Sequence, residues 1–441
     1  MNSLKKPSLS GFGRFSFITL GCKSNQYDSA AMAAQLERAG LRPGSAGEAD
    51  VIVVNTCMVT GPTEAQCRKA IRQARRASAR ARIVVSGCLS AGSREQVEAM
   101  EEVDVVIEPG EKGSLAALLG LDASGDWSDW PDDPAVDLGD RDRGFLKVQD
   151  GCDAACAYCI VPLVRGPSRS LSPERVLDAV RRLMERGAAE VVLSGIHLGQ
   201  YGGGLQPATS LEDLLDRLLE SDLPGRLRLS SIEPLEITPR LIQTMSAAEG
   251  RICRHLHIPL QSGSDHILKA MGRPYLAHHF TEIVRILRTS VPGIGIGCDV
   301  ICGFPGESER DFQDTLRIIE ELQIPFVHAF PYSPRPGTRA AGMADNVPHE
   351  VKKERVWLIR KAAEANRHLF ASSFVGEVLR AALEGTTRDP GPRPGLTDNY
   401  LRVLVKDPCE GMMGERIADI LIKGLDGEVL EGAWTRHAGN G

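Results

Sequence analysis

Three cysteines with the spacing of metal ligands, Cys152, Cys156 and Cys159, lie in the segment DGCDAACAYCIVP. With three and two residues between them, these thiolates can close around one metal centre, and zinc or iron–sulfur sites usually have four protein ligands. The residues that follow, IVPLVRGPSRS, contain neither cysteine nor histidine. Because a catalytic metal site keeps one position open, this spacing predicts a cluster with one iron available to a substrate.

A second set of cysteines ends three β-branched apolar runs in the first third of the chain. RFSFITLGC ends at Cys22, ADVIVVNTC at Cys57 and ARIVVSGC at Cys88, and helical segments are expected at 29–40 and 62–80. Buried strands that alternate with helices predict a doubly wound parallel sheet, which binds ligands at the carboxyl ends of its strands. A free cysteine is most often a buried packing residue. Three at successive strand ends favour a metal or redox cluster.

Other cysteines and histidines carry weaker signals. Cys298 and Cys302, in CDVIC, are about 13 Å apart along a strand, too far for a shared ion or a disulfide. We interpret both as structural, and likewise Cys67, which lies inside a predicted helix. His255 and His257 share one face of a strand, but with about 6.6 Å of rise between them and no carboxylate in their segment, a positioning role for His257 is favoured. Eleven widely spaced cysteines indicate reduced thiols rather than a disulfide framework.

A second alternating series follows the segment 122–142, which is rich in aspartate, proline and glycine and is typical of a linker. Six strands are expected, at 145–149, 190–196, 227–233, 255–261, 296–304 and 326–333. Helical periodicity lies between them, at 173–186, 211–221, 239–248 and 309–322. Six βα units predict an incomplete (β/α)6 barrel, with active residues at the carboxyl ends of its strands. The cysteine segment at 152–159 comes directly after the first of these strands.

The last part of the chain changes period. After Pro348 a long helix is expected, and then EVLRAALEG, YLRVLVKD, GERIADILIKG and GEVLEGAW alternate as short strands around the loop TRDPGPRPGLTDN. This pattern predicts a small β-barrel. We therefore divide the chain into four parts, at 13–121, 122–142, 143–371 and 372–438.

The charge balance limits the possible partners. A net charge of -6 argues against uniform affinity for nucleic acids, so a nucleic-acid contact requires a local basic patch. Arg68, Arg72 and Arg75 share one face of the helix after Cys57, although a solvated face is the more common reason for such a run. Arg165 and Arg169 follow the cysteine segment and are expected to meet a substrate.

No membrane or secretion signal is recognised. No apolar run is long enough to span a bilayer, and the run FSFITL is shorter than the core of a signal peptide. We predict a cytoplasmic protein.

Cys-x3-Cys-x2-Cys after the first strand of a partial barrel resembles the signature of radical S-adenosylmethionine enzymes. The motifs TLGCKSNQYDS, VVNTC, VSGC, KVQDGCDAACAYCIVPLVRGPSRS, LSGIHLGQYG, SSIEP, HIPLQSGSDHILKAMGR, GFPGE and FPYSPRPGTRA resemble the methylthiotransferase family over nearly the whole chain. CKSNQ and GIHLGQYG look most like the branch that acts on N6-threonylcarbamoyladenosine beside the anticodon of tRNA.

The resemblance implies two 4Fe-4S clusters and S-adenosylmethionine as cofactors. In the family, S-adenosylmethionine chelates the open iron of the radical cluster and is cleaved to methionine and a 5′-deoxyadenosyl radical. By the same resemblance, Cys22, Cys57 and Cys88 hold a second cluster that carries the sulfur, and a methylthio group is delivered to C2 of the adenosine. A flavodoxin- or ferredoxin-like electron donor is implied, and the C-terminal β-barrel would be an RNA-binding module of the TRAM type.

Four further residues are candidates for binding S-adenosylmethionine. Tyr158 could cover an adenine ring, and Gly195 could let the methionine part approach the backbone closely. Glu233 and Gln261, at later strand ends, could bond ribose or carboxylate. Ordinary packing, a turn and a salt bridge are the alternatives for Tyr158, Gly195 and Glu233, respectively. Cys298 departs from the threonine that is common in the family.

Two classes of function remain open at this point. The first is a radical enzyme that methylthiolates tRNA, and the second is a noncatalytic iron–sulfur protein that binds RNA or senses redox state. Two cysteine triads that each lack a fourth ligand favour the enzyme. Within the enzyme class, isopentenyladenosine in tRNA and an aspartate of a ribosomal protein are alternative substrates. The sequence does not indicate the oligomeric state.

Overall fold

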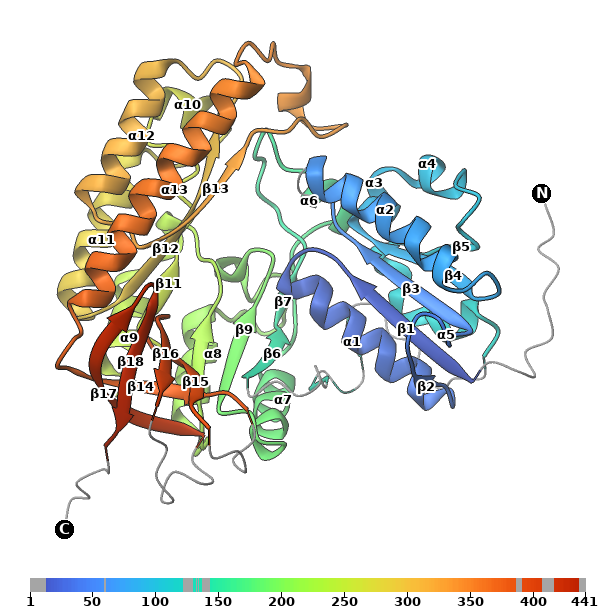
Figure 1. The fold of residues 1–441 in the computed structure, drawn as a ribbon, viewed down its shortest axis with the longest axis horizontal. Coiled ribbons are helices and arrows are strands. Elements are labelled where there is room, and N and C mark those ends of the chain that lie inside the picture. The colour runs from blue at the N-terminus through green and yellow to red at the C-terminus, as the bar shows by residue number, and fades with distance from the viewer. Residues whose placement is uncertain are drawn as a thin grey trace.

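The computed structural model describes residues 13–58, 61–121, 130–131, 133, 135–136, 143–385, 391–406 and 416–435. Figure 1 shows a parallel-sheet domain on one side, a half-open barrel in the centre and a small C-terminal β-barrel below it. Helices that could cross a bilayer are absent from these described ranges.

The N-terminal part is a five-stranded parallel sheet with strand order β2-β1-β3-β4-β5. Its strands are β1 (Arg14–Thr19), β2 (Arg42–Pro43), β3 (Val51–Thr56), β4 (Arg82–Gly87) and β5 (Val105–Val106). Its helices are α1 (Lys23–Arg38), α2 (Gly61–Ala77), α3 (Cys88–Gly92), α4 (Arg94–Glu98), η1 (Pro109–Ser114) and α5 (Leu115–Leu118). Alternate residues of β3 pack into separate cores on the two faces of the sheet. The predicted doubly wound fold is confirmed, and its strand order reverses between β1 and β3.

Helix α1 begins at Lys23, whereas the sequence predicted a helix over 29–40. The first two turns bury polar side chains, among them Ser24, Asn25 and Asp28. These residues interrupt the apolar period by which an amphipathic helix is recognised. The helix therefore starts directly after Cys22.

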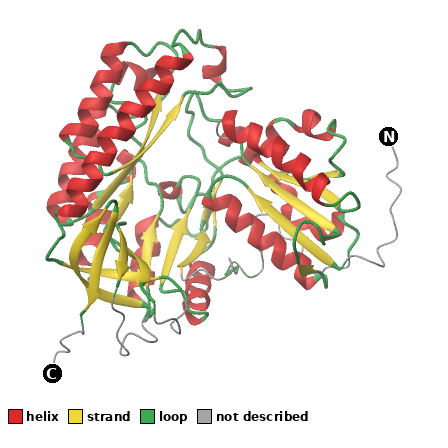
Figure 2. Cartoon of the chain, in the orientation of Figure 1, coloured by secondary structure: helices red, strands yellow, loops and turns green. Residues whose placement is uncertain are grey.

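The central part contains six parallel strands in the order β6-β9-β10 and β11-β12-β13, joined by a bridge between Leu227 and Ile252. The strands are β6 (Arg143–Lys147), β9 (Glu190–Ser194), β10 (Arg226–Leu229), β11 (His255–His257), β12 (Gly295–Cys302) and β13 (Phe326–Pro331). The helices are α7 (Pro173–Glu185), α8 (Leu211–Glu220), α9 (Pro239–Ala247), α10 (Asp265–Ala270), α11 (Ala277–Ser290), α12 (Glu309–Glu321) and α13 (His349–Ser372). The predicted partial barrel is confirmed, with helices over the outer side of β11–β13 (Figure 2).

Short elements complete the central part. They are β7 (Gln149–Asp150), β8 (Arg169–Ser170), α6 (Val161–Arg165), η2 (Leu198–Gln200), η3 (Pro234–Glu236) and η4 (Arg339–Gly342). Cys298 and Cys302 are buried in the core between the strands and their helices, which agrees with a structural role. Trp130 is also buried and donates to the Lys147 carbonyl oxygen at 2.6 Å. Most of the predicted linker, 122–142, lies outside the described residues.

The C-terminal part is a closed barrel with strand order β14-β15-β16-β18-β17. Its strands are β14 (Val378–Leu383), β15 (Arg393–Thr397), β16 (Arg402–Val405), β17 (Ile417–Asp426) and β18 (Val429–Trp434). The sequence prediction placed β15 inside a loop and was wrong there. Pro394 and Gly395 are poor strand formers, and β15 exists because it pairs with both β14 and β16. The domain boundaries stay predictions.

The small barrel docks against the amino-terminal ends of the central strands. Arg226 donates to the Leu396 carbonyl oxygen at 2.8 Å, and Arg228 donates to that of Thr397 at 2.9 Å. Both guanidinium groups pair with buried Glu190. The carboxyl ends of the strands, where the cysteines lie, are at the opposite end of the central barrel.

Candidate active site

The structure brings Cys22, Cys57 and Cys88 to the carboxyl edge of the N-terminal sheet. Gly21 has a φ of +106°, and a Cβ there would lie 2.9 Å from the Cys57 Sγ. Gly87 has a φ of +100°, and a Cβ there would lie 2.1 Å from the carbonyl oxygen of the residue before Cys57. Glycine is therefore required before two of the three cysteines, because the chain segments pass too closely for a side chain. The first two cysteines flank the point where the strand order reverses, the usual ligand site of such sheets.

Asn25 fixes the strand ends that carry this triad. Its Nδ2 donates to the carbonyl oxygens of Leu20 and Thr56, each at 2.8 Å. Its Oδ1 accepts from Arg165 Nη2 at 2.6 Å. The buried Asn25 amide thus joins the ends of β1 and β3 to Arg165, which follows the cysteine segment at 152–159.

Cys67 is buried in α2 beside the triad. The Cys57 backbone N–H donates to the Cys67 Sγ at 3.3 Å, and that thiol donates to the Cys57 carbonyl oxygen at 3.4 Å. Burial raises the pKa of the Cys67 thiol. These contacts hold the backbone of Cys57 and fit the structural role that the sequence suggested.

Cys152, Cys156 and Cys159 lie on the loop between β7 and α6. The Cys152 backbone N–H donates to the Gly166 carbonyl oxygen at 3.1 Å, and the Cys159 N–H donates to that of Cys156 at 3.3 Å. Gly151 has a φ of +75°, and a Cβ there would lie 1.9 Å from a backbone oxygen. The loop is therefore a tight turn that gathers three half-buried thiols.

Two of these thiols form hydrogen bonds with side chains from the loops that follow other strands. Arg273 Nη1 donates to the Cys156 Sγ at 3.0 Å, and His197 Nδ1 lies 3.3 Å from the Cys152 Sγ. Glu233 pairs with Arg273, and Glu236 lies 2.8 Å from His197 Nε2. Arg273 with Glu233 and His197 with Glu236 thus form two supports for the cysteines. Both carboxylates come from the turn after β10. Such outer groups orient metal ligands and tune the metal.

The charge state of these supports follows from their contacts. Burial alone would lower the pKa of His197, but the hydrogen bonds to Cys152 and Glu236 raise it to about 9. Sequence reasoning assigned no role to His197 or Arg273, although both lie in quoted motifs. Their distance from the cysteines along the chain hid the contacts.

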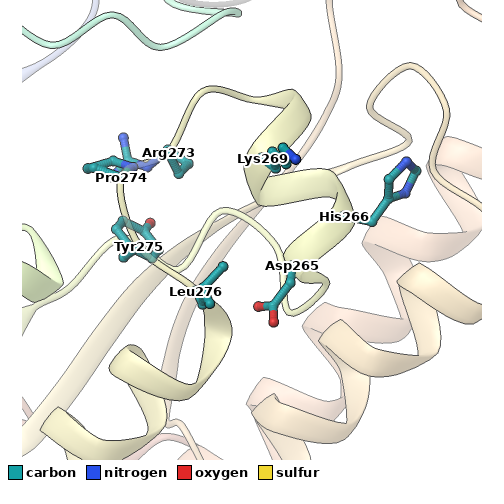
Figure 3. Close-up of a pocket in the computed structure, with 7 residues that line it drawn as sticks. All are labelled: Asp265, His266, Lys269, Arg273, Pro274, Tyr275 and Leu276. Carbon is teal, nitrogen blue, oxygen red and sulfur yellow. The ribbon is translucent and has the colours of Figure 1, made fainter.

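Arg273 also lines a surface pocket of about 500 Å³ at the end of α10 (Figure 3). The lining residues are Asp265, His266, Lys269, Arg273, Pro274, Tyr275 and Leu276. The Arg273 guanidinium stacks on the Tyr275 ring, 4.8 Å from its centroid. This ring and Glu233 together hold the guanidinium toward Cys156.

The donor chemistry of both triads fits an iron–sulfur cluster. Soft thiolates are the ligands such clusters prefer, and each site offers three. Burial raises the pKa of Cys159 to about 12. A thiolate at Cys159 therefore needs a metal or another cation to stabilise its charge. The nearby hydrogen-bond donors stabilise the thiolate form of the cysteines they contact.

A buried ion network lies between the two triads. Lys147 Nζ is 2.7 Å from Asp28 Oδ1 and 2.8 Å from Asp150 Oδ2, and Lys112 also pairs with Asp28. Arg165 Nη1 is 2.9 Å from Asp150 Oδ1. The prediction that Arg165 meets a substrate is wrong, because its guanidinium is buried in these pairs. Arg165 instead joins α1, which follows Cys22, to β7, which precedes Cys152.

The candidates for binding S-adenosylmethionine have varied surroundings. Tyr158 is half-buried and packs against an apolar cluster near Met271. A Cβ on Gly195 would lie 2.8 Å from a side-chain oxygen of Gln149, so close packing requires glycine there. Glu233 forms a salt bridge with Arg273, which is the alternative role predicted for it from the sequence. Gln261 is buried four residues after the end of β11 with a φ of +62°, a strained backbone of the kind that clusters at functional sites.

His257 has a carboxylate partner that its own segment does not contain. Asp299 of β12 places its Oδ2 3.1 Å from His257 Nε2. The sequence prediction overlooked this contact because it joins two strands. His255 is separate and stacks on the Tyr400 ring, with 4.1 Å between centroids.

The arginine face of α2 is paired within its own domain. The pairs are Arg68 with Glu64 at 3.0 Å, Arg72 with Glu102 at 4.0 Å and Arg75 with Asp104 at 2.5 Å. These contacts favour the solvated face over a phosphate contact.

Comparison with known proteins places these sites in a family. The model described as uncharacterized protein family UPF0004 matches residues 14–108, and the radical SAM superfamily model matches residues 146–319. A threonylcarbamoyladenosine tRNA methylthiotransferase, MtaB, of Bacillus subtilis (strain 168) is 34% identical, covering 92% of this chain and 93% of that protein. The chain belongs to the radical S-adenosylmethionine methylthiotransferase family.

Further members of this family have other named substrates. A tRNA-2-methylthio-N(6)-dimethylallyladenosine synthase of Alkalilimnicola ehrlichii is 35% identical, covering 88% of this chain and 90% of that protein. A ribosomal protein uS12 methylthiotransferase, RimO, of Desulforudis audaxviator is 34% identical, covering 87% of this chain and 88% of that protein. Among solved structures, the radical S-adenosylmethionine methyltransferase TsrM from Kitasatospora setae shares the fold, with a TM-score of 0.56, 17% identity and coverage of 74% and 76%.

Membership of this methylthiotransferase family makes the chain an enzyme and makes two 4Fe-4S clusters and S-adenosylmethionine its cofactors. The alternative of a noncatalytic iron–sulfur protein is therefore wrong. The six triad cysteines stay the predicted ligands of these clusters.

Proposed function

We propose that this methylthiotransferase inserts a methylthio group at C2 of N6-threonylcarbamoyladenosine beside the anticodon of tRNA. The observation that carries the proposal is the pair of cysteine triads, each at strand ends and each short of a fourth protein ligand. An open iron at each site would let one triad serve S-adenosylmethionine and the other serve the sulfur.

In this proposal Cys152, Cys156 and Cys159 hold the radical cluster. When bound, the cluster and S-adenosylmethionine supply a 5′-deoxyadenosyl radical. Arg273 and His197 donate to two of the thiolates, and the turn containing Glu233 and Glu236 keeps both donors in place. This arrangement orients the ligands and tunes the redox potential.

Cys22, Cys57 and Cys88 hold the second cluster. Asn25 fixes the strand ends on which two of these cysteines stand, and the buried network through Arg165 connects them to the radical site. Its buried ion pairs join α1, which follows Cys22, to β6, which leads to the radical site.

The S-adenosylmethionine contacts proposed from the sequence are kept for Tyr158, Gly195 and Gln261. Tyr158 offers a ring face beside the cysteine loop, and Gln261 forms a bridge to Val300 of β12. For Glu233 we favour the positioning role through Arg273, since its carboxylate is already paired.

The tRNA substrate is supported by the names of relatives such as the Bacillus subtilis protein. Relatives named for dimethylallyladenosine, also called isopentenyladenosine, and for ribosomal protein uS12 define the alternative substrates. The closed C-terminal barrel is proposed as a TRAM-like module that contacts the tRNA. Electrons would come from a flavodoxin- or ferredoxin-like donor.

The test is mass spectrometry of tRNA nucleosides after anaerobic incubation of the iron-loaded protein with S-adenosylmethionine, a reductant and tRNA bearing threonylcarbamoyladenosine. A methylthio-sized gain on that nucleoside is expected. Free 5′-deoxyadenosine without this gain would contradict the proposed substrate and retain the radical chemistry. Parallel reactions with dimethylallyladenosine tRNA and with ribosomal protein uS12 then distinguish the two alternatives.

A further inference from the structure

Four polar side chains on the inner side of the central barrel are not used by either cysteine triad. Asp299 of β12 lies between two histidines, with its Oδ2 3.1 Å from His257 Nε2 and its Oδ1 3.7 Å from His328 Nδ1. The fourth is Lys23, whose ammonium lies 5.7 Å from the Phe145 ring centroid on β6. The His328 side chain is 63% exposed, so this group faces open space rather than packed core.

Lys23 enters the barrel from the N-terminal domain. It directly follows Cys22, and α1 packs against β6. Its charge also helps to lower the pKa of His328 on β13, after the effects of burial and of His257. The Lys23 ammonium therefore lies against β6 at one edge of the half-open barrel, directly after Cys22, and its charge acts on His328 at the other edge.

The Lys23 cation contacts the Phe145 ring but no acidic group within the described parts of the chain. Lys23 forms neither an ion pair nor a hydrogen bond there, although it is only partly exposed. An unpaired cation inside a protein is costly unless a ligand completes its interactions. Asp299 is a hydrogen-bond acceptor with capacity beyond its two histidines. A ligand that suits both groups carries an anion together with hydrogen-bond donors.

The group lies deeper in the barrel than the cysteines. Asp299 and His328 each precede the last residue of their strand by three residues, or about 10 Å of extended chain. In adenine, C6 is separated from C2 by N1 alone, so the N6 substituent leaves the ring on the side that carries C2. A substituent of several atoms can extend from there along the strands toward this group.

We propose that Lys23 binds the carboxylate of an amino-acid substituent on N6 of the substrate adenosine, and that Asp299, His257 and His328 bind its hydroxyl and N–H groups. This inference rests on the proposed function and names the residues that select its substrate. A threonylcarbamoyl group has a carboxylate, a hydroxyl and ureido N–H groups, whereas a dimethylallyl group is a hydrocarbon. A dimethylallyl group would desolvate the Lys23 ammonium and the remaining acceptor sites of Asp299 without bonding to them, which a site of this kind rejects strongly.

A divalent metal ion is the competing occupant. One ligand atom from each of His257, Asp299 and His328 lies within 4.8 Å of the others, and no ion is present. Histidines that bind metals usually donate their other ring N–H to a carboxylate or carbonyl. Neither His257 Nδ1 nor His328 Nε2 has such a partner among the described residues, which favours the substrate group over the metal.

The experiment measures kcat/KM for two tRNAs that carry threonylcarbamoyladenosine or dimethylallyladenosine at the same position. The holoenzyme is compared with Lys23→Met and Asp299→Asn, and with Lys353→Met on the exposed face of α13 as a matched control. We expect each of the first two variants to lose roughly 10-fold to 100-fold on the threonylcarbamoyl substrate, as for a hydrogen bond to a charged group. Iron content and a KM-dominated loss exclude damage to the cluster beside Lys23.

Free nucleosides give a second measurement that needs no variant. N6-threonylcarbamoyladenosine should inhibit the wild-type reaction at a concentration at least about tenfold lower than N6-dimethyladenosine or N6-dimethylallyladenosine, because only the first pairs with Lys23. Equal inhibition would overturn the inference.

The outcomes separate the two proposals. A wild-type enzyme that modifies only dimethylallyladenosine contradicts the proposed function itself. If the wild type modifies threonylcarbamoyladenosine but Lys23→Met and Asp299→Asn stay within about twofold of it, only the further inference fails. One equivalent of a metal other than iron, present in the wild type and lost in Asp299→Asn, would overturn the inference in favour of a metal site.

Discussion

The two cysteine triads reach similar chemistry by different routes. Cys152, Cys156 and Cys159 lie on a single turn, and their thiols receive hydrogen bonds from Arg273 and His197. The other triad is assembled from three strand ends, and its nearest support is an amide, Asn25, that bonds the backbone and not the sulfur. The first kind of site depends on local chain geometry, and the second depends on the sheet.

The two sites should therefore respond differently when the residues around them are substituted. A turn keeps its cysteines together even when its surroundings change, so its supports adjust reactivity. Strand ends come together only if the sheet is intact, so the supports of that triad decide whether the site exists at all.

The largest effects should come from the cysteines themselves. Cys156→Ala should abolish cleavage of S-adenosylmethionine, because it removes a ligand of the radical cluster. Cys57→Ala should leave some cleavage but no methylthio product. Quantifying 5′-deoxyadenosine and methylthiolated nucleoside by mass spectrometry separates the two. Methylthio product from Cys57→Ala would show that the two triads do not have distinct roles.

Asn25→Ala should damage the sheet-based site selectively. It removes the Asn25 donor from the buried Thr56 carbonyl and the half-buried Leu20 carbonyl, at a cost of about 1–3 kcal/mol for the buried group. We expect iron to fall from roughly eight to roughly four atoms per chain, with cleavage of S-adenosylmethionine retained. Asn346→Ala is the matched control, since its amide oxygen bonds an exposed loop at Gly306. Full iron content in Asn25→Ala would show that Asn25 is not needed to hold the ends of β1 and β3 together.

Arg273→Met should change reactivity without removing the radical cluster. It deprives Cys156 of a charged donor, and loss of such an outer group typically costs 10-fold to 100-fold in activity. Electron paramagnetic resonance of the reduced protein should show the cluster still present with an altered signal. Loss of the cluster in this variant would mean that Arg273 builds the site and does not only tune it.

Cys67→Ala should have the smallest effect. Its thiol makes only weak hydrogen bonds to the Cys57 backbone, so iron content and product yield should stay near wild-type values, with a small decrease in melting temperature. Iron analysis and thermal unfolding check this. Loss of about four iron atoms would make Cys67 a fourth ligand. The site of Cys22, Cys57 and Cys88 would then have no open position.

Sequence reasoning located the cysteines because their signal is local. Each strand-end cysteine follows a buried apolar run, and the other three share one short segment. The start of α1 was missed because Ser24, Asn25 and Asp28 are polar residues that only the folded protein buries. Strand β15 was missed because its pairing partners outweigh the poor strand propensity of Pro394.

Contacts between distant segments account for the remaining errors. Arg165 follows the cysteine segment in sequence and suggested a substrate contact, yet Asp150 and Asn25 surround its guanidinium. The partner of His257 is Asp299, which comes from the next strand. Neither pairing leaves a pattern in a single segment.

By itself the sequence determined the layered fold of the first two domains and the cysteines at their strand ends, because apolar periodicity and ligand spacing are properties of neighbouring residues. Only the tertiary structure decided which groups surround those cysteines. Arg273, His197, Asn25 and Lys23 acquire their roles from side chains and backbone groups far away in the chain. Their interactions depend on distances of a few ångströms, which strand register and packing set and which no local pattern encodes.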